Sequence, residues 1–114
     1  MATEPTFHFE VEKSEDEHKL PLTTIKCHGR LTSGATGPLK DLVKSLIDAG
    51  GQHIVIDCGE LESMDSSGLG TLVGLKVSSI NKGLGKLRLV NLSPRVAELL
   101  RLTNLGNLLT TEYR

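Results

Sequence analysis

The chain has 114 residues, of which 38% are hydrophobic, so it can form one domain whose core needs neither a metal ion nor a disulfide bond. The 13 Lys and Arg residues nearly balance the 14 Asp and Glu residues, leaving a formal charge of −1, and only 1 Tyr and 2 Phe are available to stack on bases. Direct binding of nucleic acid is therefore not expected.

The start of the chain and its cysteines bear on location. The first residues, Met-Ala-Thr-Glu-Pro, lack the basic and then apolar pattern of a secretory leader, and no apolar run is long enough to span a bilayer. Cys27 and Cys58 each lie in an apolar, strand-like segment, where a buried reduced thiol is the simplest expectation. We therefore predict a cytoplasmic protein without a membrane span, folded as a single domain over residues 1–114, with residues 1–6 flexible.

In chain order, the first predicted elements are two strands. Residues 7–12 alternate apolar and polar side chains, as a half-buried strand does, and the charged residues 14–19 predict a solvated turn. A second strand is expected over residues 22–27. Residues 29–37 are rich in glycine and hydroxyl side chains and predict a long loop, after which Pro38 suits the first turn of a helix.

A helix and a buried strand follow. Apolar residues at helical spacing predict one buried helix face: Leu39, Leu42, Val43, Leu46 and Ile47. We expect this helix to end at Gly50-Gly51. Residues 53–58 then predict a central strand, and the uninterrupted apolar residues 54–56 indicate that helices cover both of its faces and that its neighbours are parallel.

A second helix is predicted from Ser66 to about Asn81. Its expected apolar stripe comprises Leu69, Leu72, Val73, Val77 and Ile80. Lys76 falls inside this stripe, so its side chain either extends along the apolar surface to reach water or marks a face that is open to a partner.

The last predicted elements are a strand over residues 86–90, a short helix and a final short strand within residues 105–111. Ser93 is the expected N-cap of this helix and Pro94 its first residue. The buried side of the helix is expected to comprise Val96, Ala97, Leu99 and Leu100. Together the elements predict an α/β fold, with a mixed, mostly parallel sheet of about four to five strands packed with about three to four helices.

The junction between the central strand and the second helix carries the strongest functional signal. Residues 61–70 read LESMDSSGLG, which places an acid and two hydroxyls at the helix start. A helix start offers unpaired N–H groups and a partial positive charge, so a hydroxyl there can carry a phosphate. Ser66 or Ser67 is therefore a candidate regulatory switch. The structural alternative is that Asp65 or Ser66 only caps the helix, with glycine permitting a tight turn.

Other chemical signals are weak. The glycines at 68, 70 and 74 do not have the spacing of a dinucleotide-binding loop, and residues 83–86 lack the length and hydroxyl of a phosphate-binding loop. No histidine pairs with Ser66 in sequence as a catalytic base would. Neighbouring strands could gather Cys27, His28, His53 and Cys58, but their spacing is not that of a metal site. We predict no catalytic residue, no metal and no cofactor.

Residues 54–74 resemble the signature of bacterial anti-sigma factor antagonists of the STAS fold. The order of the predicted elements agrees with that family, as does the segment Asn-Leu-Ser-Pro at residues 91–94. In this family a serine kinase that is also the anti-sigma factor phosphorylates the hydroxyl residue directly after the aspartate. The resemblance thus implies that Ser66 is the phosphorylation site, with Ser67 as the alternative.

The same resemblance implies a function and partners. The unphosphorylated domain would bind the anti-sigma factor serine kinase and release a sigma factor, and a phosphatase would reverse the modification. The implied partner-binding residues are Arg30, Thr32, Ser33, Asp65, Ser66, Ser67, Gly68 and Leu69, with Lys76 as a further candidate. One departure concerns residues 29–32, which read Gly-Arg-Leu-Thr where kinase substrates of the family carry Gly-Glu-Leu-Asp. Arg30 thus reverses a charge and could steady a phosphate.

Two alternatives remain. The domain could be a constitutive STAS scaffold subunit of a larger signalling or transport assembly, in which the serine pair only caps the helix. It could also be a small-ligand or nucleotide-binding STAS domain that uses the helix start to bind an anion. An enzymatic function ranks last.

Overall fold

The computed structural model describes residues 7–32, 34–49, 53–81, 86–103 and 110–113. In chain order its elements are β1 (Phe7–Glu15), β2 (Pro21–Leu31), α1 (Thr36–Ala49), β3 (His53–Met64), α2 (Ser66–Asn81), β4 (Lys86–Leu92), α3 (Pro94–Thr103) and β5 (Thr110–Tyr113). The strands form one 5-stranded sheet in the order β1-β2-β3-β4-β5. Only β1 and β2 pair antiparallel, so the predicted α/β fold with a mixed, mostly parallel sheet is confirmed.

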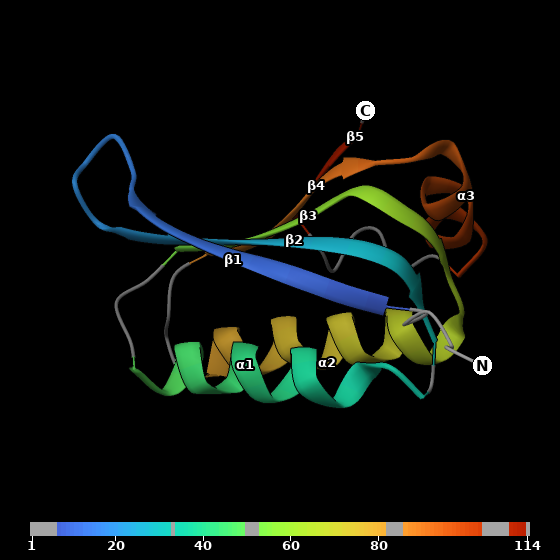
Figure 1. Ribbon diagram of the computed structural model, residues 1–114, viewed down its shortest axis with the longest axis horizontal. Coiled ribbons are helices and arrows are strands. Elements are labelled where there is room, and N and C mark those ends of the chain that lie inside the picture. The colour runs from blue at the N-terminus through green and yellow to red at the C-terminus, as the bar shows by residue number, and fades with distance from the viewer. Residues whose placement is uncertain (1–6, 33, 50–52, 82–85, 104–109, 114) are drawn as a thin grey trace, which may run out of the picture.

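Helices pack on both faces of the sheet (Figure 1). α1 and α2 lie side by side beneath it, whereas α3 lies on the opposite face and contacts β3 and β4. The central strand β3 is covered on both sides, because Ile54, Val55 and Ile56 are only 3%, 7% and 1% exposed. The prediction from these three residues is confirmed. β1 and β2 carry exposed polar residues, among them His8, Glu10 and Lys26.

The predicted loop over residues 29–37 is wrong in part. β2 continues through Gly29 and Arg30 to Leu31, which pairs with Met64 at the end of β3. The strand accommodates Gly29 at a positive φ of 91° beside a shift in register, as glycine does at a β-bulge. α1 then begins at Thr36, so Pro38 does lie in its first turn as predicted.

The first strands are also longer than the sequence pattern indicates. β1 extends to Glu15, so the turn comprises only the residues between Glu15 and Pro21. In it, the N–H of Asp16 donates to the carbonyl oxygen of Leu20, and Lys19 adopts a φ of 63°. Pairing with β2 across the whole hairpin explains why the polar residues Ser14 and Glu15 stay in the strand.

Burial of side chains in α1 and α2 agrees with the predicted apolar stripes in one helix and differs from them in the other. The α1 stripe is confirmed: Leu39, Val43, Leu46 and Ile47 are buried and Leu42 packs against the core. The α2 stripe is wrong at Val77, which is 45% exposed, and it omits Leu75, which is 1% exposed. Because α2 is apolar or small on most sides, its hydrophobic pattern does not fix one buried face.

The C-terminal part follows the prediction closely. The hydroxyl oxygen of Ser93 accepts a hydrogen bond from the N–H of Val96 at 3.3 Å, which confirms Ser93 as the N-cap of α3. Val96 and Leu100 lie on the buried face of that helix. The expected final strand within residues 105–111 overlaps β5 only at residues 110 and 111. Residues 104–109, like residues 1–6 and the expected helix end at Gly50-Gly51, lie outside the described residues.

Candidate functional site

The candidate site is the junction of β3 and α2, and Asp65 caps it. The carboxylate oxygen Oδ1 of Asp65 accepts a hydrogen bond from the N–H of Gly68 at 2.9 Å, and its carbonyl oxygen accepts one from the N–H of Leu69 at 3.0 Å. These two bonds are those of a helix N-cap, which settles the choice between Asp65 and Ser66. Ser66 is therefore the first residue of the helix, and both Ser66 and Ser67 are exposed.

The junction is fastened to the end of β2. The N–H of Asp65 donates to the carbonyl oxygen of Leu31 at 3.3 Å. A Cβ atom on Gly68 would overlap that same carbonyl oxygen and would lie 2.9 Å from Cγ of Met64. Glycine at position 68 thus lets the first turn of α2 approach the β2 backbone. This contact fixes the position of Ser66 relative to the end of β2.

The predicted partner-binding residues differ in how exposed they are. Arg30, Ser66 and Ser67 are exposed, whereas Thr32 and Asp65 are half-buried. Placing Leu69 on the docking surface is wrong, because its side chain is 1% exposed and belongs to the core.

Gly68 and Ser33 are the two remaining predicted partner-binding residues. Gly68, which the resemblance implied to be a partner-binding residue, is buried and packs closely against Leu31. Ser33 lies outside the described residues.

An ion pair lies near the junction of β3 and α2. The Nε atom of Arg30 lies 3.7 Å from Oε2 of Glu62, and both side chains are mostly exposed. Arg30 and Glu62 come from the adjacent strands β2 and β3, near the ends that precede α1 and α2. Water screens an exposed pair of this kind, so Arg30 remains available to another anion at little energetic cost.

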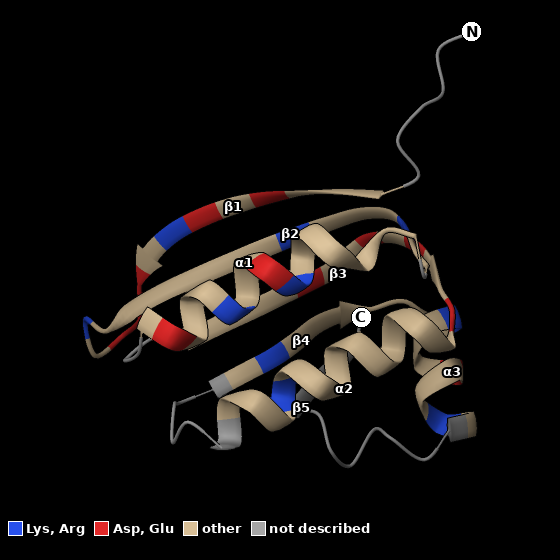
Figure 2. Ribbon diagram, turned by 90° about the horizontal axis from the view of Figure 1, so that it is seen from below, with Lys and Arg blue, Asp and Glu red and all other residues tan. Residues whose placement is uncertain are grey.

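A groove between α1 and α2 borders the site, and sequence reasoning missed it. It has a volume of about 410 Å³. Its walls include Lys40 and Lys44 of α1 and Ser67, Gly70, Thr71 and Gly74 of α2. α2 carries little charge beside the lysines of α1 (Figure 2). Small residues at positions 67, 70, 71 and 74 follow the spacing of one helix face, which was the available signal.

Lys76 makes a contact that the sequence pattern did not predict. Its amine Nζ donates a hydrogen bond to the carbonyl oxygen of Leu87 in β4 at 3.1 Å. The side chain thus links α2 to the sheet beneath it. This bond gives Lys76 a structural role.

Among the residues that the structure describes, the four side chains considered as metal ligands do not form one cluster of ligand atoms. Cys27 and Cys58 are free and buried, as predicted, and burial raises the pKa of both thiols. Nδ1 of His53 lies 3.1 Å from Oδ2 of Asp16, whereas Nε2 of His28 lies 3.2 Å from Oε1 of Glu10. The two histidines thus face different acids. Among the residues that the structure describes, no helix has the length and apolarity needed to cross a membrane.

Comparison with known proteins agrees with this architecture. The STAS domain model matches residues 9–113. The anti-sigma factor antagonist SpoIIAA in its unphosphorylated form is similar with a TM-score of 0.72 at 25% identity, over 91% of this chain and 87% of that one. The phosphorylated form of Bacillus SpoIIAA, a cell fate determinant, gives a TM-score of 0.68 at 24% identity, over 91% and 90% of the two chains.

A larger protein contains a similar domain. The murine anion transporter Slc26a9 gives a TM-score of 0.61 at 17% identity, over 71% of this chain but only 13% of its own. The fold therefore occurs both as a small regulator and within a transporter. With a family match across almost all of its length, this chain belongs to the STAS-domain family.

Proposed function

We propose that this domain is a phosphorylation-regulated anti-sigma factor antagonist that acts in the bacterial cytoplasm. With Ser66 unmodified, it binds an anti-sigma factor serine kinase, and the sigma factor held by that kinase is released. The kinase brings the nucleotide and the chemistry, so the domain has no catalytic role. The observation that carries this proposal is the exposed Ser66 at the first position of α2, capped by Asp65 and fastened to Leu31.

The similarity to SpoIIAA supports the proposal. That anti-sigma factor antagonist has been solved both without and with phosphate, and both forms share the fold of this chain. The two forms indicate that this type of domain tolerates a phosphate without refolding. Residues 54–74 of this chain carry the order of strand, aspartate, serine pair and helix on which the resemblance to anti-sigma factor antagonists rests.

A phosphate on Ser66 would change the surface far more than the fold. It adds about −1.5 to −2 charges and three acceptor oxygens. The free N–H groups at the start of α2 stabilise an anion there by about 0.3–1 kcal/mol, which allows the free domain to carry the modification. A partner docked on the same surface would meet the added charge beside the carboxylate of Asp65. Repulsion and desolvation then oppose docking.

The proposed docking surface comprises Asp65, Ser66, Ser67 and Thr32, together with the groove between α1 and α2. The groove is continuous with the serine pair, since Ser67 forms part of its wall. Gly70 and Gly74 leave open space above the α2 backbone, because a Cβ atom at either position would contact nothing within 4 Å. A partner side chain can therefore enter between the helices.

Arg30, like Thr32, distinguishes this surface from that of other kinase substrates of the family. In the unmodified protein its guanidinium pairs with Glu62. We propose that it turns to a phosphate on Ser66, because a charge-assisted hydrogen bond to phosphate is stronger than a screened surface pair. Arg30→Ala should then slow phosphorylation or speed dephosphorylation. Unchanged values for both rates would remove this role.

The first test is intact-mass analysis, with site mapping, of the protein isolated from its own cells in growth and in stress. A species heavier by about 80 Da, the mass of a phosphoryl group, should appear in the wild type and in Ser67→Ala but not in Ser66→Ala. Its fraction should change with the growth condition. Phosphate mapped to Ser67 would move the switch by one residue, and absence of phosphate in every condition would reject it.

The second test measures binding with purified components. The protein is mixed with an anti-sigma factor serine kinase of the same organism, with and without ATP. We expect a complex with the wild type that ATP dissolves and that persists in Ser66→Ala. A complex that ATP leaves intact with the wild type would contradict the switch.

The scaffold function is the second candidate, because a similar domain forms 13% of the Slc26a9 transporter chain. In that case the serine pair only begins the helix and binding is constitutive. A stable complex in cells together with unmodified Ser66 in every condition would favour it. The nucleotide-binding alternative relies on Lys40 and Lys44 beside the groove. It predicts a melting temperature that rises with nucleotide concentration.

A further inference from the structure

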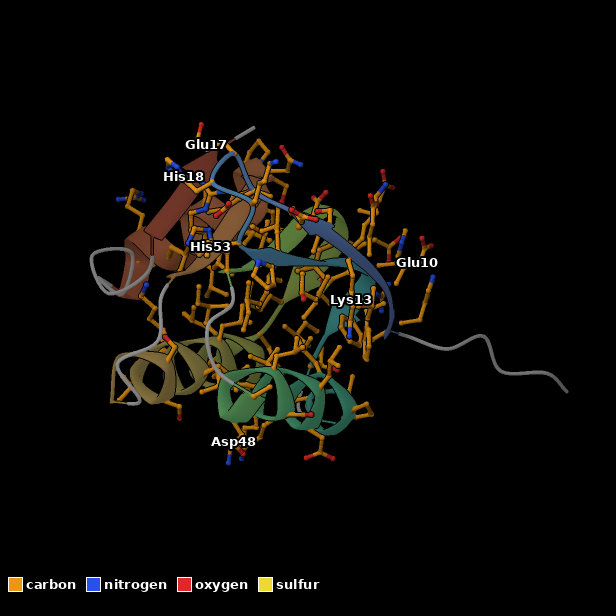
Figure 3. All side chains as sticks on the ribbon, turned by 90° about the vertical axis from the view of Figure 1, so that its left-hand side faces the viewer. Glu10, Lys13, Glu17, His18, Asp48 and His53 are labelled. Carbon is orange, nitrogen blue, oxygen red and sulfur yellow. The ribbon has the colours of Figure 1, made fainter. Side chains whose placement is uncertain are left out.

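Three potential metal ligands meet on the outer face of the β1–β2 hairpin, away from α1 and α2. His8 of β1 lies directly opposite His28 of β2 in the antiparallel register. Glu10 is two residues beyond His8, so it projects from the same face of the strand. Figure 3 shows Glu10 on the outer side of β1, far from the turn that carries His18.

The side chains of this cluster are close. The imidazole rings of His8 and His28 are stacked, with centroids 4.5 Å apart and an interplanar angle of 1°. Oε1 of Glu10 lies 3.2 Å from Nε2 of His28. One ligand atom from each of the three residues can be chosen so that all lie within 4.8 Å of one another.

The buried nitrogen of His28 is the second observation. Its Nε2 atom is inaccessible to solvent and makes no hydrogen bond to the described residues, although Glu10 is near. A buried polar atom without a hydrogen bond is costly and uncommon in folded proteins. An ion held jointly by His28 and Glu10 would satisfy this nitrogen.

We propose that His8, Glu10 and His28 form a binding site for a divalent transition-metal ion, with Zn²⁺ and Ni²⁺ as the best fits. Two neutral imidazoles and one carboxylate are the donor set that such ions prefer, whereas Mg²⁺ and Ca²⁺ prefer oxygen ligands. Ligand atoms about 2.1 Å from a tetrahedral ion are about 3.4 Å apart, so the cluster must close. The lone pair of an imidazole nitrogen lies in the plane of its ring, so the stacked rings must also turn out of parallel before both nitrogens can face one ion. His8 and Glu10 are exposed and can turn to do so.

The surroundings leave room for further ligands. A polar hollow of about 390 Å³ adjoins the cluster, with Glu10, Glu12, Lys26 and Asp57 in its walls. Water or a small anion could enter from this side. On the other side of His28, the register position in β3 holds Glu60, which is exposed. Binding would cross-link the edge strand β1 to β2 and should stabilise the hairpin.

The test is calorimetric titration of the full chain, purified without a histidine tag, with Zn²⁺ and separately with Ni²⁺. We expect one ion per chain. His8→Ala, His28→Gln and Glu10→Gln should each weaken binding at least about tenfold, since even outer-shell partners contribute that much to affinity. His18→Ala is the matched control, because His18 is exposed beside an acid, Glu17, in the distant turn. It should bind as the wild type does.

A second measurement locates the ion even where a variant folds poorly. Substoichiometric Co²⁺ added to the wild-type protein should broaden the NMR signals of His8, Glu10 and His28 before those of His18 and His53. Absence of binding in the titration would overturn the proposal. So would a wild-type affinity in His28→Gln, or broadening centred on the turn.

Discussion

The carbonyl oxygen of Leu31, at the end of β2, occupies the space in which any residue other than glycine at position 68 would place its Cβ atom. The same oxygen accepts a hydrogen bond from the N–H of Asp65 at 3.3 Å. One backbone atom of the sheet therefore sets the position of both the cap and the first turn of α2. The orientation of Ser66 depends on this contact.

Gly68→Ala should destabilise the protein by about 1–3 kcal/mol, the usual cost of forcing an extra methyl group into a packed site. The overlap is with a backbone atom, which cannot move away as the end of a side chain can. Gly70→Ala is the matched control in the same helix, where a Cβ atom meets open space. It should stabilise by about 0.5–1 kcal/mol. Urea unfolding of both variants checks the pair, and equal effects would contradict the contact.

Asp65→Ala should lower the free energy of unfolding by about 0.5–2 kcal/mol, because the N–H of Gly68 loses its acceptor. Asp65→Asn keeps an oxygen that can accept this bond and should stay close to the wild type. Chemical unfolding monitored by circular dichroism distinguishes the two. A loss of equal size in Asp65→Asn would show that charge rather than capping is the main contribution.

The two thiols should be inert in the native protein. Burial, with the neighbouring thiol and Asp57 adding to it, raises the pKa of Cys27 far above its usual range. Burial and then the Asp57 carboxylate raise the pKa of Cys58 to about 12. Since the thiolate is the reactive form, a disulfide reagent at pH 8 should modify neither cysteine until denaturant is added, when both should react. Rapid reaction of the native protein would contradict the burial of these strands.

Stability should fall in acid partly through Asp16. The N–H of Leu20, and also that of His18, donates to this carboxylate and holds its pKa below the ordinary value of 3.8, with His53 adding to the effect. The folded state therefore favours the ionised form. Its contribution is fully present above pH 3.8 and is lost as the pH falls through the lower folded-state pKa.

Asp16→Asn tests this pH dependence. The variant should be less stable than the wild type at neutral pH, and the difference should shrink as the pH falls below 3.8. Urea midpoints measured across this range give the result. Glu17→Gln, at the exposed neighbouring position, should show no such trend. A difference that is constant with pH would mean that ionisation of Asp16 does not contribute to stability.

The sequence by itself determined the class and order of the elements. The unbroken apolar residues 54–56 can be buried on both sides only if helices cover both faces of the strand. This requirement makes β3 a central strand with parallel neighbours. The α1 stripe and the Ser93 cap were equally readable, because helical spacing and capping are local properties. The Asp-Ser-Ser-Gly segment at residues 65–68 likewise indicated the junction of strand and helix.

Only the tertiary structure decided which side chains are buried and which residues distant in sequence are in contact. Leu69 follows the serine pair in sequence, yet it is buried, because the first turn of α2 faces the core. β2 runs on to Leu31 because β3 offers it a partner strand, a reason that the glycine-rich residues 29–37 do not contain. The cluster of His8 with His28 depends on hairpin register in the same way. Local pattern sets an element and its apolar face, but pairing between distant residues sets where the element ends and what it contacts.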